Sequence, residues 1–394
     1  MKFLIINTDY PEFLGWLYAR NPGLEDSPYQ EQLRVRMDSL FGVADFYSHN
    51  LQKLGHEAWD IHANNEFMQK AWAREHGHKI KETSKLNQQY RSTIRQGVAV
   101  AAKTPLRHLK PFFRPVMRSL VDQQTRFHEI LTAQIEYYKP DILLNLSMDG
   151  IGSQFLKQVK PHVRLLVGQH AATRLSDTED FSCYDLATSS FPPTIEFFRQ
   201  KGIHAELNRL CFEPRVLSYL KDTSSPFDVT FVGSFFSVHS SRTELLETIC
   251  TRYPKTKIWG PEINQLPSNS PIRGCYKGPA WGRQMFQILH NSKITLNHHG
   301  DVAPYANNFR LYEATGVGSL LLTDWKPNLH EMFEPGKEAV AYRSAEECIE
   351  LIDYHFKHDE ERKTIAQAGQ KRTLREHTYY QRMQELVEIV RKYL

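Results

Sequence analysis

Several features are scarce in this sequence of 394 residues, and each scarcity excludes a class of protein. The five cysteines form neither a CxxC pair nor a zinc-ligand spacing with histidine, so we expect buried, reduced thiols and no disulfide framework. No run approaches the roughly 18 apolar residues of a membrane-spanning helix, so any membrane contact would be peripheral. The start, MKFLIINTDY, has one basic residue and a short apolar core, which predicts a first β-strand and not a signal peptide. These absences favour a cytoplasmic protein.

The sequence also lacks a large excess of either positive or negative charge. The formal net charge of +4 and the pI near 8.6 are too weakly basic to indicate nucleic-acid binding. Hydrophobic residues make up 41% of the chain and charged residues 24%, which is an ordinary globular balance. A chain of this length predicts two domains.

The first half of the chain alternates strand and helix signals. The predicted strands cover residues 2–8, 56–62, 140–147, 163–170 and 184–190, and the clearest helices cover residues 29–54 and 192–202. Alternation of this kind is typical of a parallel sheet with helices on both faces. It predicts an N-terminal α/β domain over residues 1–220.

The pattern restarts after a polar, turn-rich linker at residues 221–226. Further strands are predicted over residues 227–234, 255–261, 293–299 and 319–324, and helices over residues 242–253, 281–292, 307–318 and 346–377. We therefore predict a second α/β domain over residues 226–375. A last helix at residues 376–394 could pack on either domain.

A basic segment interrupts the alternation at about residues 63–135. Between Arg74 and Arg126 it carries twelve Lys or Arg residues against three acids, a net charge of +9, and its pattern is helical. We predict a helical basic insert in the N-terminal domain. Such helices suit peripheral contact with an anionic membrane or a lipid-linked saccharide, and a solvated excursion with ordinary charges is the alternative.

Five stretches of the C-terminal half occur in one order over about residues 228–383: DVTFVGSFFSVHSSRTELL, LHNSKITLNHHG, NNFRLYEATGVGSLLLTD, LHEMFEPGKEAVAYRSAEE and IAQAGQKRTLREHTYYQRM. In sequence and order they resemble glycosyltransferases of the GT-B architecture (the glycosyl transferases group 1 family), in particular the CgeB-like, spore-maturation type. FYSHNLQKLGHE, YDLATSS and CFEPRVL in the N-terminal half are similar to the same group.

This resemblance implies two Rossmann-like domains that face each other across a cleft, with the sugar nucleotide on the C-terminal domain and the acceptor on the N-terminal domain. It implies a hexosyltransferase-like enzyme that moves a sugar from a nucleoside-diphosphate sugar, with a UDP-type donor favoured. The acceptor would be a hydroxyl of a saccharide, a lipid-linked glycan or a protein, at the inner face of the membrane if the insert binds lipid. No Asp-x-Asp motif occurs, so we expect a reaction without metal or cofactor.

Two other functions stay open for the same sequence. One is a sugar-nucleotide epimerase of the same fold, which needs no second substrate. The other is a non-catalytic protein that binds a nucleotide sugar or a glycan.

A donor diphosphate requires positive charge and free backbone N–H groups. Gly233 and Ser234 follow a predicted strand and lead into a helix that begins near Arg242. N–H groups at a helix start, together with an arginine, can hold phosphate oxygens. A plain strand–turn–helix junction with a surface arginine is the alternative.

Glu313 is the predicted ribose ligand. The resemblance implies an acid just before a glycine-containing turn, and the two oxygens of a carboxylate suit two vicinal hydroxyls. Arg310 lies three residues earlier on the same helix face, where it could bind the donor or simply pair with Glu313. Asn308, at the start of this helix, is placed in the same site. Many retaining relatives have a second acid eight positions earlier, where this chain has Tyr305, so the retaining sugar-contact pattern is in doubt.

Polar residues end the predicted strand in LNHHG. Asn297 and His298 are expected to face the cleft and contact the pyrophosphate or the sugar. His299 is equally well explained as a surface histidine. The two histidines have no third ligand at metal spacing, so no metal site is predicted.

Two loops are expected to form the wall beside the base. Gly260 lies in WGP, and Tyr276 and Lys277 lie in YKGP. Backbone groups and the aromatic face of Tyr276 would suit a uracil or a similar base.

The acceptor hydroxyl needs a general base if the reaction inverts, and an oxocarbenium-like state needs stabilisation if it retains. Asp9, Asp149 and His170 each follow a buried predicted strand, which would place them at the cleft. We predict these three as the candidate catalytic residues, and capping of a loop is the alternative for each.

Overall fold

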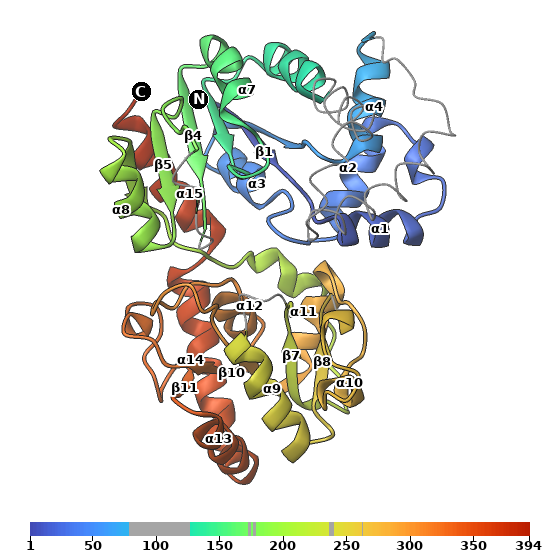
Figure 1. The fold of residues 1–394 in the computed structure, drawn as a ribbon, viewed down its shortest axis with the longest axis vertical. Coiled ribbons are helices and arrows are strands. Elements are labelled where there is room, and N and C mark those ends of the chain that lie inside the picture. The colour runs from blue at the N-terminus through green and yellow to red at the C-terminus, as the bar shows by residue number, and fades with distance from the viewer. Residues whose placement is uncertain (79–126, 172–174, 176–178, 236–239, 262) are drawn as a thin grey trace, which may run out of the picture.

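A computed structural model describes residues 1–78, 127–171, 175, 179–235, 240–261 and 263–394. The chain forms two lobes, one above the other in Figure 1, and each is built on its own sheet. The strand order in the described residues is β2-β1-β3-β4-β5-β6 in the N-terminal sheet and β11-β10-β9-β7-β8 in the C-terminal sheet. All of these neighbours pair in parallel, as the alternating sequence pattern predicts.

The N-terminal lobe is assembled from short strands and the helices that connect them. Its strands are β1 (Lys2–Asn7), β2 (Glu57–His62), β3 (Ile142–Asn145), β4 (Leu165–Gln169), β5 (Leu186–Ser189) and β6 (His204–Leu207). Its helices are α1 (Pro11–Arg20), η1 (Leu24–Asp26), α2 (Tyr29–Asp38), α3 (Phe46–Lys53), α4 (Glu66–Glu75), helical residues 127–138, α7 (Ser153–Val159), η3 (Lys160–His162), α8 (Pro192–Gln200) and η4 (Pro214–Tyr219).

The C-terminal lobe follows the same plan. Its strands are β7 (Phe227–Val232), β8 (Lys257–Trp259), β9 (Ser292–Asn297), β10 (Leu320–Asp324) and β11 (Val340–Tyr342). Its helices are α9 (Ser240–Arg252), η6 (Ile263–Gln265), α10 (Ile272–Cys275), α11 (Gly282–His290), α12 (Arg310–Gly316), η7 (Leu329–Glu331), α13 (Ala345–Lys357) and α14 (Asp359–Glu376). The sequence predicted one helix over 346–377; the structure divides it at His358 into α13 and α14.

Apolar residues cover both faces of each sheet. In β1 the side chains of Phe3 and Ile5 join one core, and those of Leu4 and Ile6 join another, because successive residues of a strand point to opposite faces. All four are fully buried. Strands covered on both sides read as continuous apolar runs, which is why KFLIIN predicted a strand so clearly.

The last helix, α15 (Tyr379–Arg391), leaves the C-terminal lobe and packs on the N-terminal one (Figure 1). Thr378 and Gln381 form a capping box that starts it. Before this start, the Tyr379 N–H donates to the Phe212 carbonyl at 3.0 Å, and the Phe212 N–H donates to the His377 carbonyl at 2.8 Å. The two connections between the lobes therefore run side by side as a short paired segment.

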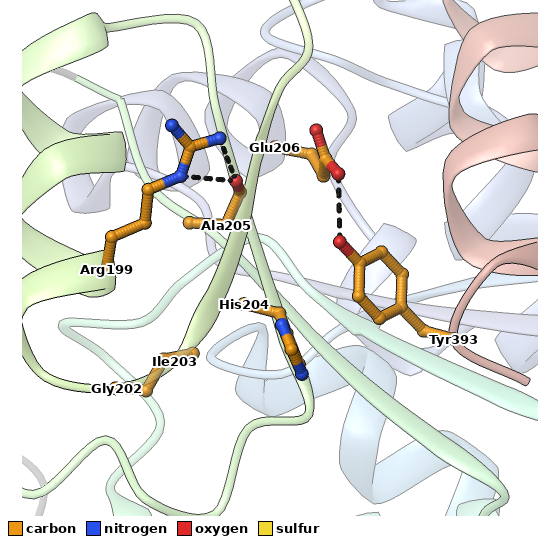
Figure 2. Close-up of a pocket in the computed structure, with 7 residues that line it drawn as sticks. All are labelled: Arg199, Gly202, Ile203, His204, Ala205, Glu206 and Tyr393. Carbon is orange, nitrogen blue, oxygen red and sulfur yellow. Dashed lines mark hydrogen bonds between the residues drawn. The ribbon is translucent and has the colours of Figure 1, made fainter.

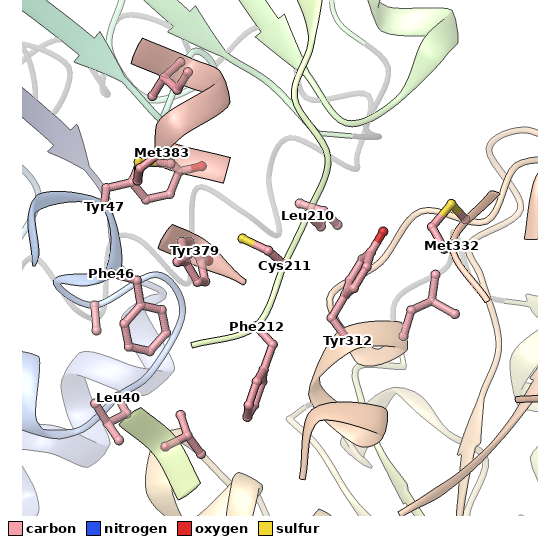
Figure 3. Close-up of a cluster of buried hydrophobic side chains, with 14 of the residues drawn as sticks. Leu40, Phe46, Tyr47, Leu210, Cys211, Phe212, Tyr312, Met332, Tyr379 and Met383 are labelled. Atoms are coloured by element: carbon pink, nitrogen blue, oxygen red, sulfur yellow. The ribbon is translucent and has the colours of Figure 1, made fainter. Parts of the chain in front are cut away.

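A hydrophobic cluster surrounds these connections and joins the lobes (Figure 3). Phe46 and Tyr47 of α3, Phe212 of the linker and Tyr312 of α12 are all buried in it. Gly316 permits this packing, because a Cβ there would lie 2.5 Å from the Phe212 ring. Gly318, with φ of +86°, then reverses the chain into β10.

Loops at the carboxyl ends of the N-terminal strands meet the C-terminal lobe. Tyr10, after β1, lies 6.4 Å from Trp281 between ring centroids, and Phe191, after β5, lies 5.8 Å from Tyr305. Tyr305 itself follows the carboxyl end of β9. The carboxyl edges of the two sheets therefore face each other, which is where parallel α/β sheets bind ligands.

The structure also bears on the predictions about the cysteines, the basic insert and membrane-spanning helices. All five cysteines are buried and none forms a disulfide, as their spacing indicated. Most of the predicted basic insert, residues 79–126, lies outside the described residues. Its described ends are helical: α4 on one side and residues 127–138 on the other. In the described chain no helix combines the length and apolar character needed to cross a membrane.

Candidate functional site

The carboxyl edge of the C-terminal sheet gathers most of the predicted donor residues. Gly233 and Ser234 follow β7, Asn297 ends β9, and His298 comes next. Arg242 lies on α9, which follows β7. Arg310 and Glu313 lie on α12, which follows β9. The sheet order places β9 between β7 and β10, so these residues come from adjacent elements.

Glu313 and Arg310 form an ion pair at this edge. The carboxylate lies 2.8 Å from Arg310 Nη1, and both side chains are largely buried, with 15% and 13% exposed. Burial raises the pKa of Glu313, and the arginine opposes that rise. Arg310 also donates from Nη2 to the Val232 carbonyl at 3.0 Å, which ties α12 to the end of β7. The arginine thus fixes the orientation of the Glu313 carboxylate.

Arg242 is engaged by the backbone. Its Nη1 donates to the Ser234 carbonyl at 3.2 Å and its Nη2 to the His298 carbonyl at 2.6 Å. The side chain is buried, and burial lowers its pKa to about 10, so it stays protonated at neutral pH. It was expected as a surface arginine or a phosphate ligand. Arg242 is therefore not a surface arginine, and it braces the ends of β7 and β9; its role in phosphate binding stays a prediction.

A hydrogen-bonded chain continues from the end of β9. The Tyr342 hydroxyl donates to the Asn297 carbonyl at 2.7 Å and contacts His298 Nδ1 at 3.0 Å. On its other side His298 Nε2 lies 3.0 Å from Ser241 Oγ. The Asn297 side chain accepts from Asn308 Nδ2 at 2.9 Å. These contacts hold the predicted residues Asn297, His298 and Asn308 together at one edge.

His299 is a correction to the sequence analysis. It is not at the surface: its side chain is 2% exposed, and Nδ1 lies 2.6 Å from the carboxylate of Asp324. The His299 N–H also donates to this carboxylate, which Lys326 approaches at 3.1 Å. Burial would raise the pKa of Asp324, but His299, His298 and Lys326 outweigh it and hold the pKa well below its usual range. Sequence reasoning missed Asp324, although its place at the end of SLLLTD was a usable signal.

The start of α9 was expected to present free N–H groups. In the structure it faces the carboxylate of Asp301, which accepts from Ser240 and Ser241. Asp301 lies in the loop between β9 and α12 and was not predicted.

The residues predicted to line the nucleobase lie on two loops that hydrogen-bond to each other, the loop after β8 and residues 276–278. The Tyr276 hydroxyl donates to the Gly260 carbonyl at 2.7 Å, and the Lys277 N–H donates to the Ile258 carbonyl at 2.8 Å. The Gly260 N–H donates to Gly278 at 3.1 Å. The predicted residues therefore lie together, although the hydroxyl of Tyr276 is committed to the neighbouring loop.

On the N-terminal side, the structure brings Asp149 and His170 together. His170 Nδ1 lies 3.9 Å from Asp149 Oδ2, and the His170 N–H donates to the Thr188 carbonyl at 3.1 Å. His170 is 6% exposed, while the Asp149 side chain is 66% exposed. Both follow the carboxyl ends of adjacent strands, β3 and β4. An imidazole beside a carboxylate can accept a proton and be stabilised in its charged form.

Asp9 has a different environment from the other two candidates. It is buried and lies 2.6 Å from Arg36 Nη2 and 3.0 Å from His62 Nδ1. Burial alone would raise its pKa, but His62 and Arg36 outweigh it and hold the pKa well below the usual range. A carboxylate this well paired is a poor proton acceptor, so the geometry does not favour Asp9 as a base.

A separate pocket lies away from this edge. Figure 2 shows its lining residues, which lie around β6 and beside Tyr393 near the end of the chain. The volume of the pocket is about 330 Å³. Arg199 donates there to the Ala205 carbonyl at 2.8 Å, and Tyr393 donates to Glu206 at 2.8 Å. None of the predicted site residues lines it. Within the described residues, no group of three His, Cys, Asp or Glu could hold a metal ion.

Two parallel-sheet α/β domains whose carboxyl edges face each other, joined by a linker and a returning C-terminal helix, define the GT-B fold of glycosyltransferases, as predicted. Residues 242–388 match the family model described as "Glycosyl transferase-like", which covers α9 to α15 and most of the predicted donor residues. A comparison with curated proteins found no match.

Solved structures with the same fold cover the whole chain. A glycosyltransferase from Rickettsia africae is 11% identical with a TM-score of 0.56, over 100% of this chain and 98% of that one. HepE of Anabaena, solved with UDP and glucose, is 12% identical with a TM-score of 0.56, over 100% of both chains. Sucrose-phosphate synthase of Thermosynechococcus elongatus is 10% identical with a TM-score of 0.53, over 100% and 98%. At these identities the likeness establishes the fold.

Proposed function

We propose that this protein is a metal-independent glycosyltransferase of CgeB-like type that moves a sugar from a nucleoside-diphosphate sugar to a hydroxyl of a saccharide, a lipid-linked glycan or a protein. A UDP-type donor is favoured, because HepE of the same fold was solved with UDP and UDP-glucose. Contact between the basic insert and an anionic membrane, and a cytoplasmic location at the inner face of that membrane, belong to the same proposal.

The observation that carries the proposal is the Glu313 carboxylate, which Arg310 fixes at the carboxyl edge of the C-terminal sheet. It lies within the residues that match the glycosyl transferase-like family. A rigid carboxylate oriented by a buried arginine suits the two ribose hydroxyls of a nucleotide, because it accepts two hydrogen bonds without reorganisation. Asn297, His298 and Asn308 are the neighbouring polar groups, and Gly260, Tyr276 and Lys277 form the wall for the base.

On the acceptor side we assign His170 as the general base and Asp149 as the group that orients it. Proton removal from the acceptor hydroxyl makes its oxygen a better nucleophile toward the donor sugar. We assign Asp9 a structural role, because its carboxylate is paired with Arg36 and His62. Arg242 shapes the donor edge by holding β7 to β9.

A binding screen tests the central proposal. Thermal shift and calorimetry with UDP, GDP, dTDP and CMP should show one nucleotide that stabilises the protein, with UDP expected first, because ligand that binds only the folded state raises its stability. Binding to none of them would refute the proposed function.

Incubation with the donor alone separates transfer from epimerisation. A transferase should leave the nucleotide sugar unchanged until an acceptor is added, apart from slow hydrolysis. An isomerised sugar nucleotide would point to the epimerase instead. Tight nucleotide-sugar binding with turnover in neither assay would point to a binding protein.

Replacing Glu313 with Gln should weaken UDP binding by roughly 10- to 100-fold, since a hydrogen bond to a charged group is worth about 1.5–3 kcal/mol. The loss should depend on the ribose: the wild type should bind 2′-deoxy-UDP more weakly than UDP, and the variant should bind the two alike. Isothermal titration measures all four affinities. Glu360→Gln, at a carboxylate 89% exposed on α14, is the matched control and should bind as the wild type does. Equal ribose discrimination in wild type and Glu313→Gln would remove the ribose role.

A further inference from the structure

The side chain of Asp301, from the loop between β9 and α12, accepts the hydrogen bonds that Ser240 and Ser241 donate at the start of α9. Ser240 Oγ and the Ser241 N–H each donate to one oxygen of Asp301 at 3.3 Å, and Ser241 Oγ donates to the other. Asp301 is 60 residues from Ser241 in sequence, so this is not the local cap that helix starts commonly have. A carboxylate here is favoured by the helix dipole, as any anion would be.

Little else holds Asp301 in place. Its side chain is exposed, and in the described parts of the chain no Lys or Arg forms an ion pair with it. The groups that donate hydrogen bonds to it are two hydroxyls and one backbone N–H. The neighbouring residue Val302 is 44% exposed. The contacts of the Asp301 carboxylate are therefore with Ser240 and Ser241 at the start of α9.

The hydroxyl of Ser241 is also shared between two acceptors. Because Tyr342 donates its proton to the Asn297 carbonyl, Nδ1 of a neutral His298 must donate to Tyr342, and Nε2 is left as an acceptor facing Ser241. Burial lowers the pKa of His298, although Asp324 and Asp301 oppose this, and Arg242 and Lys326 add to it. One hydroxyl proton cannot serve both His298 and Asp301, so the contact with Asp301 is only partly satisfied.

We propose that Asp301 is an internal competitor of the donor's phosphate: it occupies the start of α9 in the free protein and leaves when a nucleoside diphosphate binds. This inference rests on the proposed function. A phosphate oxygen requires the same N–H and hydroxyl donors that Asp301 now uses, and two anions cannot share them. Asp301 thereby sets donor affinity without touching the bound donor.

Displacement of Asp301 has a structural consequence for the other lobe. The same loop carries Tyr305, whose ring meets Phe191 of the N-terminal lobe at 5.8 Å. Because Asp301 and Tyr305 share one loop, we expect displacement of Asp301 to act on this contact as well. The loop links occupancy of one site to the geometry of the other.

Isothermal titration of the full-length protein with UDP and with uridine tests the inference. Asp301→Asn keeps the shape of the side chain and removes its charge, so it should bind UDP about three- to tenfold more tightly than the wild type. Uridine has no phosphate and should bind both proteins equally. Asp222→Asn, at a carboxylate 98% exposed in the linker, makes the same change of net charge and should leave both affinities unchanged.

The alternative is that Asp301 only stabilises the helix start. In that case Asp301→Asn would lower the melting temperature and leave UDP affinity unchanged or weaker, which would overturn the inference. Hydrogen exchange of the wild type adds a test that needs no variant: UDP should increase exchange in residues 300–305, and unchanged or slower exchange there would count against displacement. A wild type that binds UDP while Asp301→Asn gains nothing refutes this inference alone. A wild type that binds no nucleoside diphosphate refutes the proposed function.

Discussion

Replacement of His170 by Asn is expected to reduce turnover by about 10²- to 10⁴-fold, the usual contribution of a positioned general base. Asparagine keeps a polar side chain of similar size but cannot take the acceptor's proton. In the proposed function the donor binds to the other lobe, so we expect the affinity for UDP not to change. Initial rates with saturating donor and acceptor, together with titration of UDP, measure the two quantities separately.

The neighbouring residues provide the comparison for this result. Asp149 is mostly exposed and lies 3.9 Å from the imidazole, so Asp149→Asn should cost much less turnover than loss of the imidazole itself. His204→Asn, at an exposed histidine on β6 of the same lobe, should retain wild-type turnover. Full turnover in His170→Asn would exclude the assigned base.

The second large effect is expected on stability. Arg36→Met should destabilise the protein by about 3–5 kcal/mol, because it leaves the Asp9 carboxylate buried without its main cationic partner. Both side chains are only 1% exposed, and Arg36 also donates to the Phe41 carbonyl at 3.2 Å, which fixes the loop after α2. Thermal unfolding followed by circular dichroism should show a melting temperature lowered by several degrees.

A double variant and the pH dependence identify the cause. Asp9→Asn combined with Arg36→Met removes both charges and should be more stable than Arg36→Met alone. The pKa of Asp9 is depressed in the folded protein, so its stabilisation is fully present above its unfolded pKa of 3.8 and is lost as pH falls through the folded value. The gap between wild type and Arg36→Met should therefore be large at neutral pH and shrink below about pH 4. A gap that is independent of pH would indicate lost packing instead.

The sequence was sufficient for the architecture because alternating apolar runs and amphipathic helices are local signals. KFLIIN is buried on both faces, and a short apolar run bounded by polar residues is typical of an interior strand of a parallel sheet. Glu313 could be singled out because the family resemblance implies an acid just before a glycine-containing turn, and that turn has a geometric requirement of its own. Gly316 and Gly318 meet that requirement in the structure by close packing on Phe212 and by a positive φ.

Polar contacts could not be predicted in the same way, because they join residues far apart in the chain. Arg242 was predicted as a phosphate ligand, but its hydrogen bonds to the carbonyls of Ser234 and His298 could not be predicted, because only the sheet brings these carbonyls within reach. His299 looked exposed, but β10 places Asp324 beside it.

What the sequence by itself determined is the class of fold, two α/β lobes that are each built on a parallel sheet; the donor half and its site residues stay predictions. Only the tertiary structure decided which partners surround each candidate residue. The approach of β3 and β4 pairs Asp149 with His170, while Arg36 and His62 occupy Asp9. The β9–α12 loop sets Asp301 on the start of α9. The physical reason is that apolar periodicity is a local property of the sequence. The partner of a buried charge comes from whichever element folding places next to it, so it can lie far away in the sequence.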